Sequence, residues 1–164
     1  KILPNVKLIV LFRNPVDRAY SNYHLGVREG SESLSFEDAI QVELDSLKNS
    51  EIESEDNVKK YTIPRSYIVK GFYADQLKIW LKLFKSEQLF ITSTENFESN
   101  ANNTLNKIYD FLEIPQFNLK NLEKHKVTSY PPMKDETRKF LVKLYKTHNE
   151  ELFEMISTEF DWNK

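Results

Sequence analysis

Hydrophobic residues along this chain form two short continuous runs separated by longer helical repeats. Residues 6–12 (Val-Lys-Leu-Ile-Val-Leu-Phe) are almost entirely apolar and rich in branched side chains, which predicts a parallel strand buried on both faces. Residues 88–92 (Gln-Leu-Phe-Ile-Thr) predict a second short buried strand. Because a long helical segment connects the two runs, the pattern predicts an α/β fold with a small parallel sheet flanked by helices.

Amphipathic repeats predict the helices. Asn14 is a favourable N-cap and Pro15 a favourable first residue for a helix that runs to about residue 29, where Gly30 is a typical stop. Ser35 to Asp38 has the spacing of a capping box and opens a second helix. Further helices are expected from near residue 71, over residues 102–112 and over residues 135–156.

The helical spacing also predicts which side chains face the core. They are Val16, Ala19, Tyr20, Tyr23 and Val27 in the first helix; Phe36, Ile40, Leu44 and Leu47 in the second; Tyr73, Leu77, Trp80, Leu81 and Phe84 in the third; Leu105, Ile108, Tyr109 and Leu112 in the fourth; and Leu141, Leu144, Tyr145, Leu152 and Phe153 in the last. The polar residues 48–60 are expected to form a mobile surface loop. Two strands make a poor sheet by themselves, so further strands are expected before residue 1.

Composition narrows the possible functions. The 164 residues suggest one domain, and 23 Lys plus Arg against 25 Asp plus Glu leave a net charge of −2. This lacks the basic field of a non-specific nucleic-acid binder, so any bound anion must be held by a local cluster. The three glycines form no phosphate-binding loop. No apolar run approaches the roughly 18 residues of a membrane helix, so no membrane insertion is expected.

Metal and thiol chemistry have no candidates in the sequence. There is no cysteine, which excludes disulfides and thiolate ligands and fits a reducing compartment. The three histidines, His24, His125 and His148, lie far apart in the chain and lack metal-ligand spacing. We therefore expect a protein that uses no metal.

Arg13 is the most informative candidate for binding chemistry. It follows the first predicted strand, and ligands of open α/β sheets bind at the carboxyl ends of the strands. Helical spacing places Arg18 and Ser21 on one side of the next helix, whose N-terminus also favours an anion. Guanidinium groups suit a phosphate because they donate two parallel hydrogen bonds. In the alternative, Arg13 pairs with Asp17 and Arg18 lies in solvent.

The stretch from Leu11 to Tyr23 resembles the 3′-phosphate-binding motif of the sulfotransferases, enzymes that use 3′-phosphoadenosine 5′-phosphosulfate (PAPS). The family pattern is an apolar strand followed by Arg-Asn-Pro-x-x-Arg-x-x-Ser-x-Tyr, and every marked position is filled here. The resemblance implies that Arg13 and Ser21 bind the 3′-phosphate, with Arg18 also in the nucleotide site. It also implies a three-layer, P-loop-like fold.

A second region of resemblance follows the first. Residues 70–84 look like the family's Gly-x-Tyr-x-x-x-Leu-x-x-Trp-x-x-x-Phe helix, which implies that Lys70 and Tyr73 face the substrate cleft. Glu95 lies in a stretch similar to the family's Glu-x-Leu and is expected to be a structural cap rather than a catalyst. Glu113 stands where the family usually has glycine.

The tail is similar to the heparan sulfate N-sulfotransferase type of domain and its bacterial relatives. In that group a Lys-Gly-Arg loop before Tyr-Pro-x-Met closes over the nucleotide. Lys126 matches the lysine, whereas Val127 and Thr128 do not match the glycine and arginine. Lys126 and Tyr130 are therefore candidate nucleotide contacts. The glycan-modifying members also carry a disulfide, and its absence favours a cytoplasmic bacterial-type relative.

The resemblance covers the second half of a usual sulfotransferase domain. Residues 1–164 are therefore interpreted as the C-terminal portion of one such domain, without the N-terminal phosphosulfate-binding loop and without an identifiable catalytic base. The implied reaction moves a sulfuryl group from PAPS to a hydroxyl or amine acceptor, for which a carbohydrate is one candidate. Two alternatives remain at this point: a non-catalytic interaction module derived from a sulfotransferase, and a nucleotide-dependent phosphotransferase of related fold.

Overall fold

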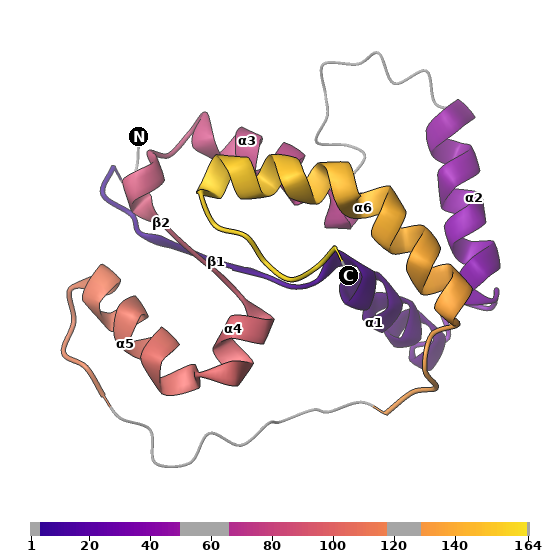
Figure 1. Cartoon of the computed structure of the whole chain (residues 1–164), viewed down its shortest axis with the longest axis horizontal. Helices are drawn as coiled ribbons and strands as arrows, with labels where there is room; N and C mark the ends of the chain where they lie inside the picture. The colour runs from indigo at the N-terminus through magenta and orange to yellow at the C-terminus, as the bar shows by residue number, and fades with distance from the viewer. Residues whose placement is uncertain (1–3, 50–65, 118–128, 164) are drawn as a thin grey trace. The chain divides into compact units, whose positions relative to one another are not determined.

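The computed structural model describes residues 4–49, 66–117 and 129–163. Its elements, in chain order, are β1 (Leu8–Phe12), α1 (Pro15–Arg28), α2 (Phe36–Asn49), a 3-10 turn (Val69–Gly71), α3 (Tyr73–Leu81), a 3-10 turn (Ser86–Gln88), β2 (Leu89–Ser93), α4 (Thr94–Ser99), α5 (Ala101–Leu112) and α6 (Asp135–Ile156) (Figure 1). They form two compact units. Unit 1 comprises Lys1–Asn14 and Lys78–Ser129, and unit 2 comprises Pro15–Leu77 and Tyr130–Lys164.

The sheet of unit 1 is parallel, as the sequence predicts. β1 pairs with β2 in a register that runs from Leu8 opposite Leu89 to Phe12 opposite Ser93. Both strands therefore end at the same edge of the sheet. Their bounds differ from the predicted runs by only one or two residues. This confirms the α/β class with a small parallel sheet and helices.

The expectation that both faces of the first strand are buried is wrong for this chain. Ile9 is 47% exposed and Leu11 is 52% exposed, whereas Phe12 is buried. Side chains alternate between the two faces of a strand, so Ile9 and Leu11 share the more exposed face. A sheet of two strands with few covering elements cannot bury the whole apolar run.

The helices of unit 1 begin at residues that cap them. The Ser93 hydroxyl accepts a hydrogen bond from the Asn96 amide at the start of α4, and the Asn100 side chain accepts one from the Asn103 amide at the start of α5. α5 confirms the helix predicted over residues 102–112 to within one residue. Its Phe111 packs against Phe90 of β2, with 5.6 Å between the ring centroids.

The core of unit 2 brings together α1, α2, α6 and the segment that starts at Ser66. Its buried members are Val16, Ala19, Phe36, Ala39, Ile40, Tyr67, Ile68, Met133, Leu141 and Tyr145. These include some of the residues predicted to face the core in α1, α2 and α6, with Tyr20, Tyr23, Leu44 and Leu144 packed at the margin. Val27 is an error of the prediction: it is 43% exposed, because it lies in the last turn of α1, beyond the packed part of the helix.

The third helix begins at Tyr73, two residues after the predicted start, because Val69–Gly71 forms a 3-10 turn. Leu77 is buried as predicted. Trp80 is not a core residue: it is 50% exposed and stacks on Phe84. Leu77 is the last buried residue of α3 and also the last residue of this segment of unit 2. The apolar repeat therefore extends past the residues that are buried in the core.

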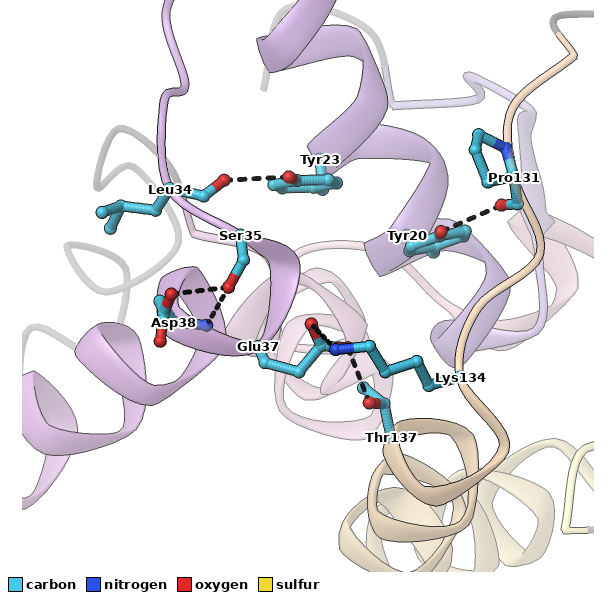
Figure 2. A network of polar contacts seen from close by, with 9 residues as sticks. All are labelled: Tyr20, Tyr23, Leu34, Ser35, Glu37, Asp38, Pro131, Lys134 and Thr137. Atoms are coloured by element: carbon cyan, nitrogen blue, oxygen red, sulfur yellow. Dashed lines mark hydrogen bonds and ion pairs between the residues drawn. The ribbon is translucent and has the colours of Figure 1, made fainter.

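Polar contacts join α1 and α2 to the segment before α6 within unit 2 (Figure 2). The Tyr20 hydroxyl donates to the Pro131 carbonyl over 2.9 Å. The Glu37 carboxylate accepts hydrogen bonds from Lys134 over 3.1 Å and from Thr137 over 2.8 Å. α1 and α2 are thus each joined to a part of the chain that lies 97 to 111 residues further along the sequence.

The predicted cap of the second helix is present (Figure 2). The Ser35 hydroxyl accepts a hydrogen bond from the Asp38 amide over 3.1 Å and donates to the Asp38 carboxylate over 2.6 Å. Asp38 therefore supports the cap through the Ser35 hydroxyl.

In the part of the chain that the structure describes, none of the helices has both the length and the apolar composition of a membrane-spanning segment. No group of three His, Asp or Glu side chains there is arranged to hold a metal ion. The predicted loop at residues 48–60 lies outside the described residues, except for Lys48 and Asn49, which belong to α2.

Candidate functional site

Arg13 lies where the sequence analysis predicts, directly after β1 at the carboxyl edge of the sheet. Its side chain is partly buried. The next residue, Asn14, donates its backbone N–H to the Glu95 carboxylate over 2.8 Å. The parallel register explains this contact, because Phe12 and Ser93 are partners and the residues that follow them leave the sheet side by side.

Glu95 acts as a cap on the backbone, as predicted, but not for its own helix. Ser93 is the N-cap of α4, whereas Glu95, in the first turn of α4, accepts the N–H of Asn14. An anion is expected at this end of β1, and the Glu95 carboxylate is one such anion that belongs to the protein itself. Because that N–H is already bonded to a carboxylate, the Arg13 side chain is the stronger candidate for binding a phosphate there.

Ser21 and Arg18 belong to α1, in unit 2, so the structure describes them separately from Arg13. Ser21 is partly exposed. Arg18 does not lie in solvent, because its guanidinium donates a hydrogen bond to the Tyr67 carbonyl and its Nε is buried without a hydrogen-bond partner among the described residues. Arg18 therefore has a structural role in unit 2, and its contact with a nucleotide stays a prediction.

Asp17 also has a partner that the sequence analysis did not find. Its carboxylate pairs with the Arg138 guanidinium of α6 at 2.5 Å. This ion pair ties the first turn of α1 to α6 within unit 2. The joint binding of a phosphate by Arg13 and Ser21 remains a prediction.

The backbone of Lys70 is tied to α3 by a hydrogen bond. It lies in the 3-10 turn before α3, and its carbonyl accepts a hydrogen bond from the Gln76 side chain over 3.1 Å. At Gly71, a β-carbon would lie 2.7 Å from a ring carbon of Tyr145 and 3.0 Å from the β-carbon of Pro15. Only glycine allows this close approach to the first residue of α1, so Lys70 has a defined place relative to that helix.

Tyr73 lies deeper than the predicted role in a cleft suggests. The residue is 8% exposed, and its ring packs edge-on against Trp162 with 6.0 Å between centroids. The structure thus places Tyr73 in the core of unit 2. A contact between Tyr73 and an acceptor stays a prediction.

Tyr130 packs on α1, the helix that carries Ser21. Its ring stacks on His24 at 4.4 Å between centroids and meets Tyr20 edge-on at 5.4 Å. The His24 Nε2 is buried without a hydrogen-bond partner among the described residues, and burial lowers the pKa of this imidazole. This lowered pKa favours the neutral form of the His24 ring in the stack. Lys126, the other tail candidate, lies outside the described residues.

Glu43 is an important residue that the sequence analysis missed. Its carboxylate accepts hydrogen bonds from the Ser66 hydroxyl and from the backbone amides of Tyr67, Ile68 and Val69, over 2.6–2.9 Å. It therefore holds the segment that leads into Lys70. No local signal could have revealed it, because its partners lie 23 to 26 residues further along the chain.

Comparison with protein families gives one match over almost the whole chain. Residues 2–164 match the model of the sulfotransferase domain. Among curated proteins, the chain is 25% identical to the membrane-associated sulfotransferase kil1 of Dictyostelium discoideum, over 98% of this chain and 48% of that protein. It is 27% identical to carbohydrate sulfotransferase 15 of Homo sapiens, over 97% of this chain and 31% of that protein.

Another similar protein is the bifunctional heparan sulfate N-deacetylase/N-sulfotransferase 4 of Mus musculus, 27% identical over 94% of this chain and 20% of that protein. The chain thus spans less than half the length of these curated relatives. A solved sulfotransferase from Alicyclobacillus acidocaldarius has the same fold, with a TM-score of 0.71 and 23% identity over 98% of this chain and 59% of that one. On the family match, which extends from residue 2 to the end, this chain belongs to the sulfotransferase domain family.

Proposed function

We propose that the protein carrying this chain transfers a sulfuryl group from PAPS to a hydroxyl or amine acceptor, and that this chain binds the 3′-phosphate of the donor. The observation that carries the proposal is the position of Arg13 at the shared carboxyl edge of β1 and β2. This is the edge at which α/β sheets bind nucleotides. The membership of the sulfotransferase family supports the identity of the donor.

The proposed reaction needs positioning more than covalent chemistry. A lone pair of the acceptor oxygen or nitrogen attacks sulfur, the sulfur–oxygen bond to the 5′-phosphate breaks, and the acceptor loses a proton. Negative charge moves onto the departing bisphosphate, so fixed cationic groups and hydrogen-bond donors lower the barrier. No residue of this chain is assigned as the base that takes the proton.

Arg13 and Ser21 act at a distance from the sulfur in this scheme. The 3′-phosphate does not react, so the energy of binding it serves to hold the donor in line with the acceptor. Arg13 offers a planar pair of donors, and the Ser21 hydroxyl offers one more. Lys126, Arg18 and Tyr130 are further proposed nucleotide contacts.

We propose a carbohydrate as the acceptor. Two relatives support this class, because one is named a carbohydrate sulfotransferase and another acts on heparan sulfate according to its name. Lys70 and Tyr73 are the proposed acceptor contacts. Lys70 has the stronger structural support, since it is partly exposed, whereas Tyr73 is buried.

Calorimetric titration of adenosine 3′,5′-bisphosphate into the full-length protein tests the proposal. Hydrogen bonds to charged groups contribute about 1.5–3 kcal/mol, so Arg13→Ala should weaken binding roughly 10–100-fold. Ser21→Ala should weaken the binding of the bisphosphate but not that of 5′-AMP, because the serine contacts only the 3′-phosphate in this proposal. Arg28→Ala, which removes the same charge from the exposed end of α1, is the control and should bind normally.

Two results would contradict the proposal. One is equal affinity for the bisphosphate in the wild type and Arg13→Ala. The other is stabilisation by ATP with magnesium but not by the bisphosphate, which would indicate a phosphotransferase.

A further inference from the structure

We propose that Glu95 is a positioning residue for the 3′-phosphate contact of Arg13. The inference rests on the proposed function and extends it from the residue that contacts the nucleotide to the residue that orients it. Glu95 lies 81 positions from Asn14 in the sequence, yet its carboxylate accepts the Asn14 backbone N–H at 2.8 Å. That N–H belongs to the peptide bond between Arg13 and Asn14, so Glu95 acts directly on the backbone of the proposed phosphate-binding residue.

The backbone at Arg13 needs such a partner. β1 ends at Phe12, so Arg13 and Asn14 lie beyond the hydrogen-bonded ladder of the sheet. A peptide group outside regular structure depends on side chains or water to fix its orientation. A carboxylate is a strong acceptor for a backbone N–H, and its hydrogen bond is shorter and stronger than that of a neutral group.

Glu95 is itself well placed to fix that peptide. It lies in the first turn of α4, a helix that begins directly after the two buried residues at the end of β2. The Ser93 hydroxyl caps α4 by accepting the Asn96 amide over 3.1 Å, and the Ser99 hydroxyl donates to the Asn96 carbonyl over 3.1 Å. The position of Glu95 thus follows from the sheet and from the capped helix rather than from a flexible loop.

The Asn14 N–H and the Arg13 side chain thus have separate roles in this arrangement. The Asn14 N–H is bonded to Glu95, and the Arg13 side chain is the group proposed to contact the nucleotide. If Glu95 only stabilised the fold, its loss would weaken the binding of all nucleotides alike. If it orients Arg13, its loss should selectively weaken nucleotides that carry a 3′-phosphate, because only these use the Arg13 side chain.

The test measures affinities of the full-length protein for adenosine 3′,5′-bisphosphate and for 5′-AMP by calorimetry. Glu95→Ala should lower the affinity for the bisphosphate about tenfold, the equivalent of one hydrogen bond. It should leave the affinity for 5′-AMP unchanged within about twofold. Glu95→Gln keeps an acceptor oxygen in the same place and should restore bisphosphate affinity to within about threefold of the wild type. Glu87→Ala removes an exposed carboxylate of the same unit and serves as the control.

Hydrogen exchange at the Asn14 amide supplies a readout independent of ligand. The amide should exchange faster in Glu95→Ala than in the wild type and in Glu95→Gln. The inference is overturned if Glu95→Ala leaves bisphosphate affinity intact, if it weakens both nucleotides equally, or if Glu95→Gln fails to restore the loss. Any of these results, with Arg13→Ala still defective, would leave the proposed function standing. A wild type that does not prefer the bisphosphate over 5′-AMP would overturn both.

Discussion

At the scale of the residue, Glu113 shows how a departure from the family pattern leaves a structural cost. It ends α5 with φ 60° and ψ 39°, a left-handed conformation that glycine adopts readily and other residues do not. The sequence resemblance places a glycine at this position. Glu113 pairs with Lys7 at 2.8 Å, and this ion pair lowers the pKa of the Glu113 carboxyl. Because the Glu113 side chain is largely exposed, solvent screens the pair and it offsets only part of the backbone cost.

A comparison of two substitutions separates the backbone cost from the ion pair. Both Glu113→Gly and Glu113→Ala lose the contact with Lys7, but only glycine relieves the left-handed strain. We expect the glycine variant to be more stable than the alanine variant by about 1 kcal/mol in urea unfolding. Equal stability of the two variants would show that the conformation carries no strain.

At the scale of the element, the segment Ser66–Gly71 is held by a carboxylate from a neighbouring helix. Glu43 of α2 accepts the backbone amides of residues 67–69, at and just before the start of the 3-10 turn Val69–Gly71, where a helix supplies no acceptor of its own. Buried donors without a partner are costly, and Tyr67, Ile68 and Val69 are nearly completely buried. The carboxylate therefore explains why this stretch folds against α2 and presents Lys70 beside the start of α1.

Glu43→Ala should lower the free energy of unfolding by about 2–4 kcal/mol, because it leaves several buried amides without an acceptor. Asp45→Ala, on the exposed face of the same helix, should change it by less than about 0.5 kcal/mol. Thermal or urea unfolding measures both. A loss no larger than that of the control would mean that water satisfies the amides.

At the scale of the whole molecule, polar pairs between distant parts of the sequence tie helices together inside unit 2. Asp17 and Arg138 are 121 residues apart in the sequence. Glu37 and Thr137 are 100 residues apart (Figure 2). Burial alone would raise the pKa of Glu37, but the hydrogen bonds from Thr137 and Lys134 outweigh it and lower the pKa below 4.5. The ionised form of Glu37 is therefore the one that stabilises the fold.

The lowered pKa of Glu37 predicts how the free energy of unfolding changes on acidification. Since the pKa is lower in the folded state, the contribution of Glu37 is complete above pH 4.5 and is lost as the pH falls through the folded-state pKa. The wild type should exceed Glu37→Gln in unfolding free energy by about 0.5–1 kcal/mol at neutral pH. That gap should narrow on acidification below about pH 4.5. Glu154→Gln, exposed on α6, should show no such gap, and a pH-independent gap for Glu37→Gln would contradict the assignment.

The local features of this protein could be predicted from its sequence because their causes are local. The continuous apolar runs located both strands to within two residues, and caps such as Ser35 located the starts of helices. The same holds for the placement of Arg13 directly after a strand and before a helix. Periodicity wrongly predicted Val27 and Trp80 to be core residues, because the helical repeat continues past the packed part of each helix. The exposure of a side chain depends on what packs opposite it.

What the tertiary structure alone decided is the set of partners. Apolar runs and helix signals were enough to predict a parallel α/β unit with an arginine at a strand end. Only the fold revealed that Glu95 holds the peptide after that arginine, that Glu43 holds the approach to Lys70, and that Arg18 bonds to a backbone carbonyl. Periodicity and capping act over a few residues, whereas these hydrogen bonds join positions 23 to 81 apart, which approach one another only when the chain has folded.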